Sequence, residues 1–575
     1  MVFSNRATQK VLPHLAPCRL PWSRPPSDLL KGPRWAKGVG PWEGKLGRLR
    51  RPVCGLRDSG LGALSASGHG GGSGRRCEQV LSQPFSLQQE PPMMWAAAGT
   101  ALALTLTLLV SLASAGPRSD EPKPTAPPIF TRRPFLVAWN APTQDCEPRF
   151  KVPLNLGIFD VEASPNEGFV NQSLTIFYRD RLGYYPYHDS HLGPVHGGVP
   201  QNSSLIDHLE RLPEVVRHYI RSPDREGLAV IDWEDWRPVW IRNWQSKDVY
   251  RKVSRQLVSS RHPTWSPEQV GKQAQYEFEF AARQFMLETL RWAKETRPRQ
   301  LWGFYLFPDC YNHDYVQNWS SYTGRCPDVE VSRNDQLAWL WAESSALYPS
   351  IYLDPMLKSS SNCRKFVRSR VEEALRVARE HHAGYSLPVF VYTRPTYTRP
   401  TYTQSFIGLS EMDLISTIGE SAALGAAGII FWGDTDYTKS PETCQKIKEY
   451  VERHLAPYLV NVSEAAFRCS EDLCHGHGRC QRRQPGSNTF LHLNPRNFRL
   501  RPSQSPKEPL FRAEGEFSQS DLAQLRDHFR CQCYLGWHGE SCQHSRKAPN
   551  RGSPGGPSGL AALLALALLI LHQVQ

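Results

Sequence analysis

Short apolar runs alternate with helical segments between about residues 135 and 462, and this alternation limits the fold more than any other feature. Six runs have the length and β-branched or aromatic content of buried strands: 135–140, 228–232, 301–305, 350–353, 387–392 and 426–432. Strands that alternate with helices over such a length predict an α/β fold, a (β/α) barrel of TIM type. In such a barrel the catalytic groups lie at the C-terminal ends of the strands.

The clearest helix begins at Ser266-Pro-Glu-Gln, which has the pattern of a capping box with proline at the first helical position. It is expected to run to about Thr296 and to end before Pro298. Its apolar stripe of Val270, Ala274, Phe278, Ala281 and Phe285 predicts core packing and nothing further.

Two carboxylates, Asp232 and Glu234, directly follow the apolar run 228–231. Because side chains alternate along a strand, these two are expected on one face, with Trp233 and Asp235 on the other. Adjacent carboxylates in apolar surroundings cannot both ionise at low cost, so one pKa should rise. A carboxylic acid that stays protonated near neutral pH is what the cleavage of a glycosidic bond requires. The alternative interpretation is a solvated turn or a helix cap.

Tryptophans around the pair favour the sugar-cleaving interpretation, since indole rings are common platforms for sugars; they are Trp233, Trp236, Trp240 and Trp244. The segment Ile231-Asp-Trp-Glu-Asp-Trp-Arg-Pro then resembles the catalytic signature of the animal hyaluronidases, a family of glycoside hydrolases. Other segments agree, among them Ile176-Phe-Tyr-Arg-Asp-Arg-Leu-Gly, Trp302-Gly-Phe-Tyr-Leu-Phe-Pro-Asp-Cys-Tyr-Asn and Asn334-Asp-Gln-Leu-Ala-Trp-Leu-Trp. The resemblance covers roughly residues 134–542 and is greatest to membrane-anchored members.

The resemblance implies a distorted barrel that hydrolyses the β-1,4 hexosaminidic bonds of hyaluronan. Glu234 would be the general acid, and Asp232 would share its proton and hold the 2-acetamido group of the substrate, whose oxygen acts as the nucleophile. By position, the substrate-binding residues would be Tyr305, Tyr352, Arg370 and Trp432.

Without the family, the alternative interpretation of Tyr305 and Trp432 is that they are core aromatics, and Arg370 would be assigned to a solvated helix face. The competing function is a cell-surface binding or receptor protein on a glycosidase scaffold, and chondroitin is the alternative substrate. No cofactor and no metal are expected.

The chain outside this region predicts passage through the secretory pathway. Residues 1–92 are rich in Pro, Gly and Arg and are expected to be a disordered upstream extension; they hold 14 Lys+Arg and 5 Asp+Glu, so 14 − 5 = +9 of the total +13 lies there. The net charge therefore gives no indication of a nucleic-acid partner. Residues 93–115 end in Ala113-Ser-Ala115 and predict a signal peptide, the alternative being a membrane-spanning helix.

Sequons predict glycosylation at Asn171, Asn202, Asn318 and Asn461. The resemblance implies disulfides that join Cys146 to Cys444 and Cys310 to Cys326, and it leaves Cys363 without a partner. Residues 469–543 resemble an EGF-like module, with 50 residues inserted between its third and fourth cysteines. The pattern of that module implies the pairs Cys469–Cys480, Cys474–Cys531 and Cys533–Cys542. The catalytic domain is expected to span residues 130–463.

A spacer, 544–559, precedes an apolar tail, 560–575, that is too short for a comfortable membrane span. Small residues, a spacer and a short apolar terminus predict a GPI anchor attached at one of Asn550, Gly552 or Ser553, the alternative being a short membrane helix. The protein would then lie on the outer leaflet of the plasma membrane. A lysosomal location and binding to cell-surface proteins are further alternatives. A five-residue repeat, 392–403, is expected at the rim of the cleft. Its arginines would meet an anionic sugar or form a solvated loop.

Overall fold

The computed structural model describes residues 122–130, 132–165, 170–398, 406–503 and 508–545. The upstream extension, the signal peptide, the apolar tail, the candidate anchor residues Asn550, Gly552 and Ser553, and positions 399–403 of the repeat lie outside these residues. Within them, no helix combines the length and the hydropathy that crossing a membrane requires.

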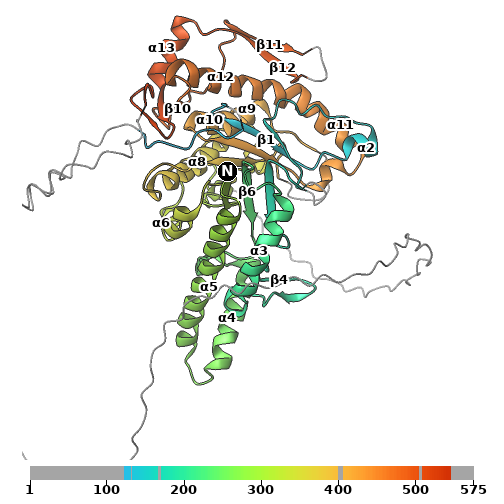
Figure 1. Cartoon of the computed structure of the whole chain (residues 1–575), viewed down its shortest axis with the longest axis vertical. Coiled ribbons are helices and arrows are strands. Elements are labelled where there is room, and N and C mark those ends of the chain that lie inside the picture. The colour runs from blue at the N-terminus through green and yellow to red at the C-terminus, as the bar shows by residue number, and fades with distance from the viewer. Residues whose placement is uncertain (1–121, 131, 166–169, 399–405, 504–507, 546–575) are drawn as a thin grey trace, which may run out of the picture. The chain divides into compact units, whose positions relative to one another are not determined.

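Parallel strands from distant parts of the chain lie side by side at the centre of the fold (Figure 1). One sheet has the order β2-β1-β9-β8 and comprises β2 (Val161–Glu162), β1 (Leu136–Asn140), β9 (Gly428–Trp432) and β8 (Phe390–Thr393). The other comprises β3 (Leu174–Tyr178), β6 (Gly227–Asp232) and β7 (Gln300–Phe304). Within each sheet, strands that are near in the chain pair in parallel, and the first strand, β1, pairs with the last, β9, as in a (β/α) barrel.

The segment from Leu347 to Ser350 joins the two sheets through isolated parallel bridges. Tyr348 bridges Tyr305 beyond β7, and Leu347 and Ser350 bridge β8 residues or their neighbours. The expectation of a regular strand at 350–353 was wrong. Pro349 has no N–H to give to a ladder, so the segment is extended but irregular. The fold is thus the distorted barrel that the sequence predicts.

Side chains inside the barrel alternate with side chains that face the helices. Buried inner positions include Leu228 and Val230 of β6 and Ile430 of β9, whereas Ala229 and Ile231 pack in the larger core outside. Continuing the same period of two, the next inner residue of β6 is Asp232 and that of β9 is Trp432. The strand pattern therefore places these side chains at the C-terminal mouth of the barrel.

Helices surround the sheets, and α3 (Leu205–Tyr219) and α4 (Asp248–Arg261) both pack on the long helix α5 (Pro267–Thr296). Ser266 and Gln269 form the predicted capping box, and the predicted helix is confirmed. Its buried stripe runs through Ala282 in place of Ala281. The other helices of the barrel region are α2 (Cys146–Phe150), α6 (Asp328–Asp335), α7 (Ala338–Glu343), α8 (Ser361–Glu380), α9 (Glu411–Leu414), α10 (Glu420–Leu424) and α11 (Pro441–Tyr450). A hairpin of β4 (Tyr187–Asp189) and β5 (Gly193–Val195) lies near α4.

The C-terminal module begins on a helix, since α12 (Ala456–Cys474) carries both Cys469 and Cys474. The expected boundary between residues 463 and 469 therefore falls inside one continuous helix. The remaining elements are β10 (Gly478–Arg482), β11 (Phe498–Pro502), β12 (Phe511–Gly515), α13 (Gln519–His528), β13 (Phe529–Cys533), β14 (Trp537–His538) and β15 (His544–Ser545). The long insertion thus forms the β11–β12 hairpin and α13.

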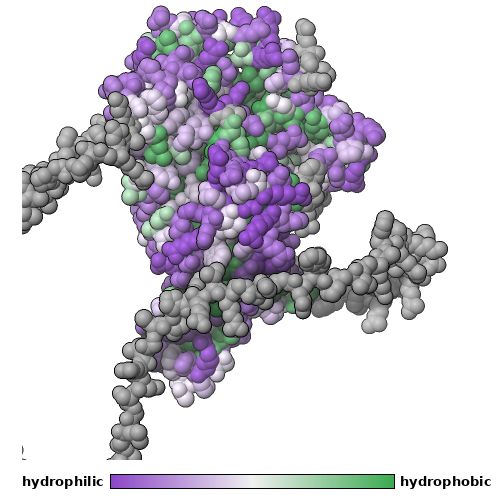
Figure 2. All heavy atoms as spheres, in the orientation of Figure 1, coloured by the Kyte–Doolittle hydropathy of each residue, from purple (hydrophilic) through white to green (hydrophobic). Residues whose placement is uncertain are grey.

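Five disulfides cross-link the described residues: Cys146–Cys444, Cys310–Cys326, Cys469–Cys480, Cys474–Cys531 and Cys533–Cys542. Cys363 is free and buried in α8. Hydrophilic residues cover most of the face seen in Figure 2, and hydrophobic residues gather over the helices in the upper part of the view.

Candidate active site

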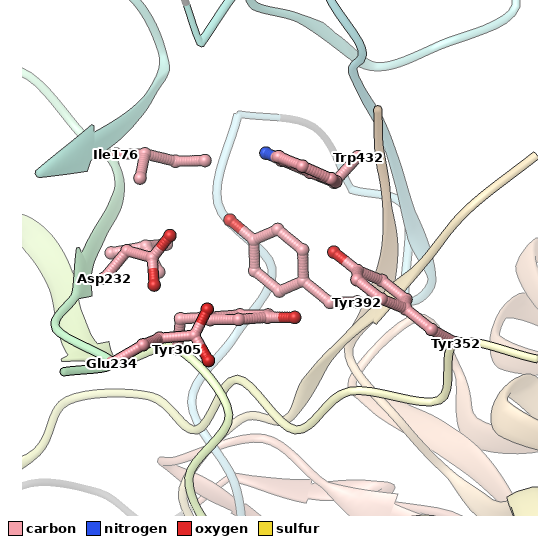
Figure 3. A pocket seen from close by; sticks show the side chains of 8 residues that line it. Ile176, Asp232, Glu234, Tyr305, Tyr352, Tyr392 and Trp432 are labelled. Carbon is pink, nitrogen blue, oxygen red and sulfur yellow. The ribbon is translucent and has the colours of Figure 1, made fainter. Parts of the chain in front are cut away.

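A cavity of about 100 Å³ opens at the C-terminal mouth of the barrel. Its lining residues come from five strands or the segments that follow them, and they are Ile176, Val230, Asp232, Glu234, Tyr305, Tyr352, Tyr392 and Trp432. Asp232 and Glu234 lie together on one side, and the rings of Tyr352 and Trp432 lie on the other (Figure 3). The gap between them is where a substrate sugar would lie.

Asp232 is the last residue of β6, and its carboxyl group is enclosed by the barrel. Its Oδ1 is buried and has no hydrogen-bond partner among the described residues. Burial, followed by the nearby charge of Glu234, raises the pKa of Asp232 to about 8, while Arg237 opposes the shift. The carboxyl group is therefore protonated at acidic and neutral pH, as the sequence predicted for one member of the pair.

Glu234 lies two residues beyond the last rung of the ladder, in which Asp232 pairs with Tyr178. Its side chain is 50% exposed, so it reaches both the cavity and solvent. At this position two cationic side chains take over the hydrogen bonding that the sheet provides for β6. The Glu234 carbonyl oxygen accepts from Arg237 Nη1 at 2.9 Å and from Lys247 Nζ. Arg237 Nη2 also lies 3.5 Å from the Glu234 carboxylate.

The residues between and after the pair face away from the cavity. The Trp233 ring stacks on Tyr185 with the ring centres 4.5 Å apart, and Asp235 pairs with Arg179 at 2.8 Å. The predicted division of these four side chains between two faces is thus confirmed. The solvated-turn alternative does not fit, because both carboxyl groups of the pair line the cavity.

Aromatic rings form the wall opposite the carboxyl pair. The Tyr352 and Trp432 rings stack at 6.2 Å between centres, and Tyr305 lies 6.3 Å from Tyr352. Trp432 Nε1 donates to the Tyr178 hydroxyl at 3.2 Å, which fixes the indole. The Tyr305 hydroxyl donates to Ser350 Oγ at 3.4 Å. The structure therefore brings Tyr305, Tyr352 and Trp432 together at the cavity, which the interpretation as core aromatics does not explain.

Tyr392 also lines the cavity, and the sequence analysis did not assign it to the site. It lies in β8, its side chain is 1% exposed, and its hydroxyl has no partner among the described residues. The signal was present, since Tyr392 ends the predicted strand 387–392 and barrel sites form at strand ends.

The substrate contact that the resemblance implies for Arg370 stays a prediction, since Arg370 is not among the residues that line this cavity. Nor is it on a solvated helix face, because only 7% of it is exposed. Its guanidinium donates to Asn312 Oδ1 at 3.1 Å and to the Ser350 carbonyl at 2.9 Å, and it pairs with Asp309 at 3.4 Å. Since Ser350 accepts from Tyr305, Arg370 is placed to support the aromatic wall from behind.

The described part of the repeat contributes one arginine near the site. Arg394 pairs with Asp434 at 2.5 Å, and its guanidinium lies 5.2 Å from the centre of the Trp432 ring. Its side chain is 12% exposed, so it is neither a solvated loop residue nor part of the cavity lining.

One group of potential metal ligands among the described residues comprises Asp335, Glu380 and His381. None of the three lines the cavity, and Arg376 pairs with both carboxylates. This group has the properties of a structural ion-pair cluster.

Comparisons with known proteins agree with this arrangement. The model of the hyaluronidase family matches residues 124–546. The chain is 65% identical to human (Homo sapiens) hyaluronidase-2 over 83% of its own length and 99% of that protein. It is 46% identical to hyaluronidase-1 of Bitis arietans over 73% of its own length and 92% of that protein.

Among solved structures, the crystal structure of bee venom hyaluronidase in complex with a hyaluronic acid tetramer is 30% identical, with a TM-score of 0.48. The match covers 56% of this chain and 98% of the bee venom chain. The family match spans most of the described residues, and it includes the strands, the carboxyl pair and the aromatic wall described above. The chain therefore belongs to the hyaluronidase family of glycoside hydrolases.

Proposed function

We propose that this protein is an endo-β-N-acetylhexosaminidase that hydrolyses the β-1,4 bonds of hyaluronan with retention of configuration. The substrate class follows from the family and from relatives named hyaluronidases. The observation that carries the proposal is the carboxyl pair: Asp232 is buried with a raised pKa, and Glu234 lies beside it, half exposed, in a cavity walled by aromatic rings.

The arrangement supports substrate assistance as the mechanism. A retaining glycosidase with its own nucleophile needs a second carboxylate across the scissile bond, about 5 Å from the acid. In this cavity the wall facing the pair consists of Tyr305, Tyr352 and Trp432, and no further carboxylate is among its lining residues. The nucleophile would then be the acetamido oxygen of the substrate sugar.

Each member of the pair has a distinct part in this scheme. Glu234 protonates the leaving oxygen and then serves as the base for water, since its exposed carboxyl group reaches the bond and solvent. Protonated Asp232 holds the acetamido group in line for attack on the anomeric carbon.

The test is hyaluronan depolymerisation by the parent protein and by Glu234→Gln, from acidic to neutral pH. The parent should cleave, and the variant should lose about 1000-fold or more in kcat because a positioned acid and base are both removed. The control is Glu442→Gln, an exposed residue of α11, which should behave as the parent does. Equal activity of Glu234→Gln and the parent would overturn the assignment; two equally inactive proteins that still bind hyaluronan would favour the receptor function.

We infer further that the protein is a glycoprotein of the cell surface, held by a GPI anchor at one of Asn550, Gly552 or Ser553. The five disulfides suit an oxidising compartment. Of the four sequons, Asn202 and Asn318 are exposed, and Asn171 and Asn461 are half-buried. Release of the protein from cells by a phosphatidylinositol-specific phospholipase tests the anchor; retention after treatment would contradict it.

A further inference from the structure

Lys247 places an ammonium group beside the catalytic acid that no carboxylate of the described residues neutralises. Its Nζ donates to the carbonyl oxygens of Glu234 and, at 3.3 Å, of Asp235. The Asp235 carboxylate is turned to Arg179 as its ion-pair partner at 2.8 Å, and Arg179 also pairs with Asp189. An ammonium carries three N–H groups, and the two carbonyls leave one for a further acceptor.

Burying the charged Lys247 amine costs free energy, because the ammonium group loses part of its hydration. Burial, followed by repulsion from Arg237, lowers the pKa of Lys247 to about 8, against the opposing influence of Glu234 and Asp235. The group therefore stays charged at acidic and neutral pH. A half-buried cation without an anionic partner, at the edge of a site for an acidic polymer, indicates a ligand carboxylate as its partner.

Lys247 is not among the residues that line the cavity, so it reaches Glu234 from outside it. The cavity accepts the acetamido sugar between the carboxyl pair and the aromatic wall. Because Glu234 protonates the leaving oxygen, the leaving sugar lies on the Glu234 side of the bond. In hyaluronan, the unit that leaves from a hexosaminidic bond is a glucuronate, which carries a carboxylate.

The turn that carries Lys247 also carries an aromatic ring, Trp244, that contacts an exposed one, Tyr311. Trp244 is in the same turn, with its carbonyl accepting from the Lys247 N–H at 3.0 Å, and its ring contacts Tyr311 at 5.5 Å. Tyr311 is 47% exposed, which is unusual for so large a ring and is suited to contact with a sugar. The neighbouring cation Arg242 does not compete for the ligand, since Glu330 pairs with it at 2.8 Å.

We propose that Lys247, together with the Trp244–Tyr311 pair, forms a subsite for the uronate on the leaving side of the cleaved bond. The Lys247 ammonium binds the uronate carboxylate, and the Tyr311 ring contacts the face of the sugar. This subsite rests on the proposed function, because it requires a substrate with a uronate in that position.

The test compares two ligands in a protein that cannot cleave them. In the Glu234→Gln background, native hyaluronan oligosaccharides that extend beyond both sides of the cavity are titrated beside the same oligosaccharides with methyl-esterified carboxylates. Lys247→Met should weaken binding of the native ligand by about 10- to 100-fold, the value of one charge-assisted hydrogen bond, and leave the binding of the ester unchanged. Lys247→Arg keeps the charge and should retain most of the preference for the native ligand.

Two further variants separate the contribution of the Lys247 charge from that of the Tyr311 ring. Lys252→Met is the matched control, because Lys252 is exposed on α4 and pairs with Asp248; it should alter neither affinity. Tyr311→Ala should weaken the binding of both ligands to the same extent, since stacking does not depend on the carboxylate.

A Lys247→Met variant that loses affinity for both ligands equally would show that Lys247 only holds the Glu234 loop, and the subsite would be overturned. Unchanged affinity for both ligands would overturn it as well. If the parent cleaves hyaluronan while either result is found, the proposed function stands and the subsite alone fails. If the parent does not cleave and Glu234→Gln binds neither ligand, both fail.

Discussion

Arg482 of β10 and Glu420 of α10 form an ion pair at 2.5 Å in which neither side chain has any exposure to solvent. Arg368 of α8 pairs with the same carboxylate at 2.6 Å and also donates to the Ser487 carbonyl of the C-terminal module. One carboxylate from the barrel thus pairs with two arginines at the junction with the module. The C-terminal disulfide-rich module is therefore joined to the barrel by a buried ion pair as well as by the continuous helix α12.

Substitution of Glu420 by Gln should destabilise the whole of the described region. The buried Arg482 guanidinium loses its counter-charge, and Arg368, which is 17% exposed, loses its carboxylate partner; the change costs about 3–5 kcal/mol in the free energy of unfolding. Chemical denaturation measures the change. The control is Glu268→Gln, whose pair with Lys272 is exposed and should contribute less than about 1 kcal/mol. Similar losses from the two variants would contradict the role of the buried cluster.

Asp232 should make the stability of the protein depend on pH. Its pKa rises from an ordinary value near 3.8 to about 8 in the folded state, so between these values the folded protein binds a proton that the unfolded chain releases. The contribution of this group is fully present below pH 4 and is lost as the pH rises to about 8, by at most about 1.4 kcal/mol per pH unit.

Asp232→Asn removes this titration, so its stability relative to the parent should increase between pH 4 and pH 8. Denaturation curves of both proteins across that range check the prediction. A constant difference between them would show that Asp232 ionises as it does in the unfolded chain.

Tyr392→Phe should impair catalysis without a loss of stability. The Tyr392 hydroxyl is buried and has no partner among the described residues, so its removal deletes no internal hydrogen bond. In the cavity it faces the position of the sugar, and the loss of one hydrogen bond to the substrate should lower kcat/KM by about 10-fold. Steady-state kinetics and thermal unfolding provide the two measurements. A large decrease in stability would mean that the hydroxyl has a structural partner instead.

Arg370→Met should affect stability and catalysis together. The substitution leaves the buried acceptors Asn312 Oδ1 and the Ser350 carbonyl without their donor, and Asp309 loses one of its arginines. We expect a loss of about 3 kcal/mol in the free energy of unfolding, and a lower kcat because Ser350 positions Tyr305. Full activity in a destabilised protein would show that Arg370 stabilises the fold but does not affect the position of Tyr305.

The carboxyl pair could be located from sequence because its geometry is local. Alternation along β6, continued for two residues past its end, predicts that Asp232 and Glu234 share a face and that Trp233 does not. Strand ends meet at one edge of a parallel barrel, and the same reasoning places Tyr305 and Trp432 at the mouth. These features need only the strand period and the direction of the chain.

Arg370 and Tyr392 required the tertiary structure. A helix pattern cannot show that the exposed-looking Arg370 of α8 is covered by the segments that contain Asn312 and Ser350. Tyr392 is the first residue of the five-residue repeat, and the repeat pattern gives no indication that this one side chain lines the cavity. The irregular segment 350–353 was predicted as a strand because its composition is β-prone, whereas Pro349 limits its pairing to isolated bridges.

The disulfide between Cys146 and Cys444 connects residues 298 positions apart, near the first and last strands of the barrel. It makes the barrel a closed covalent ring as well as a folded one. A single cut of the backbone anywhere between these cysteines would produce two fragments that remain one molecule until the bond is reduced. Endoproteolysis within the catalytic domain would then leave β1 and β9, which are neighbours in one sheet, joined through this disulfide.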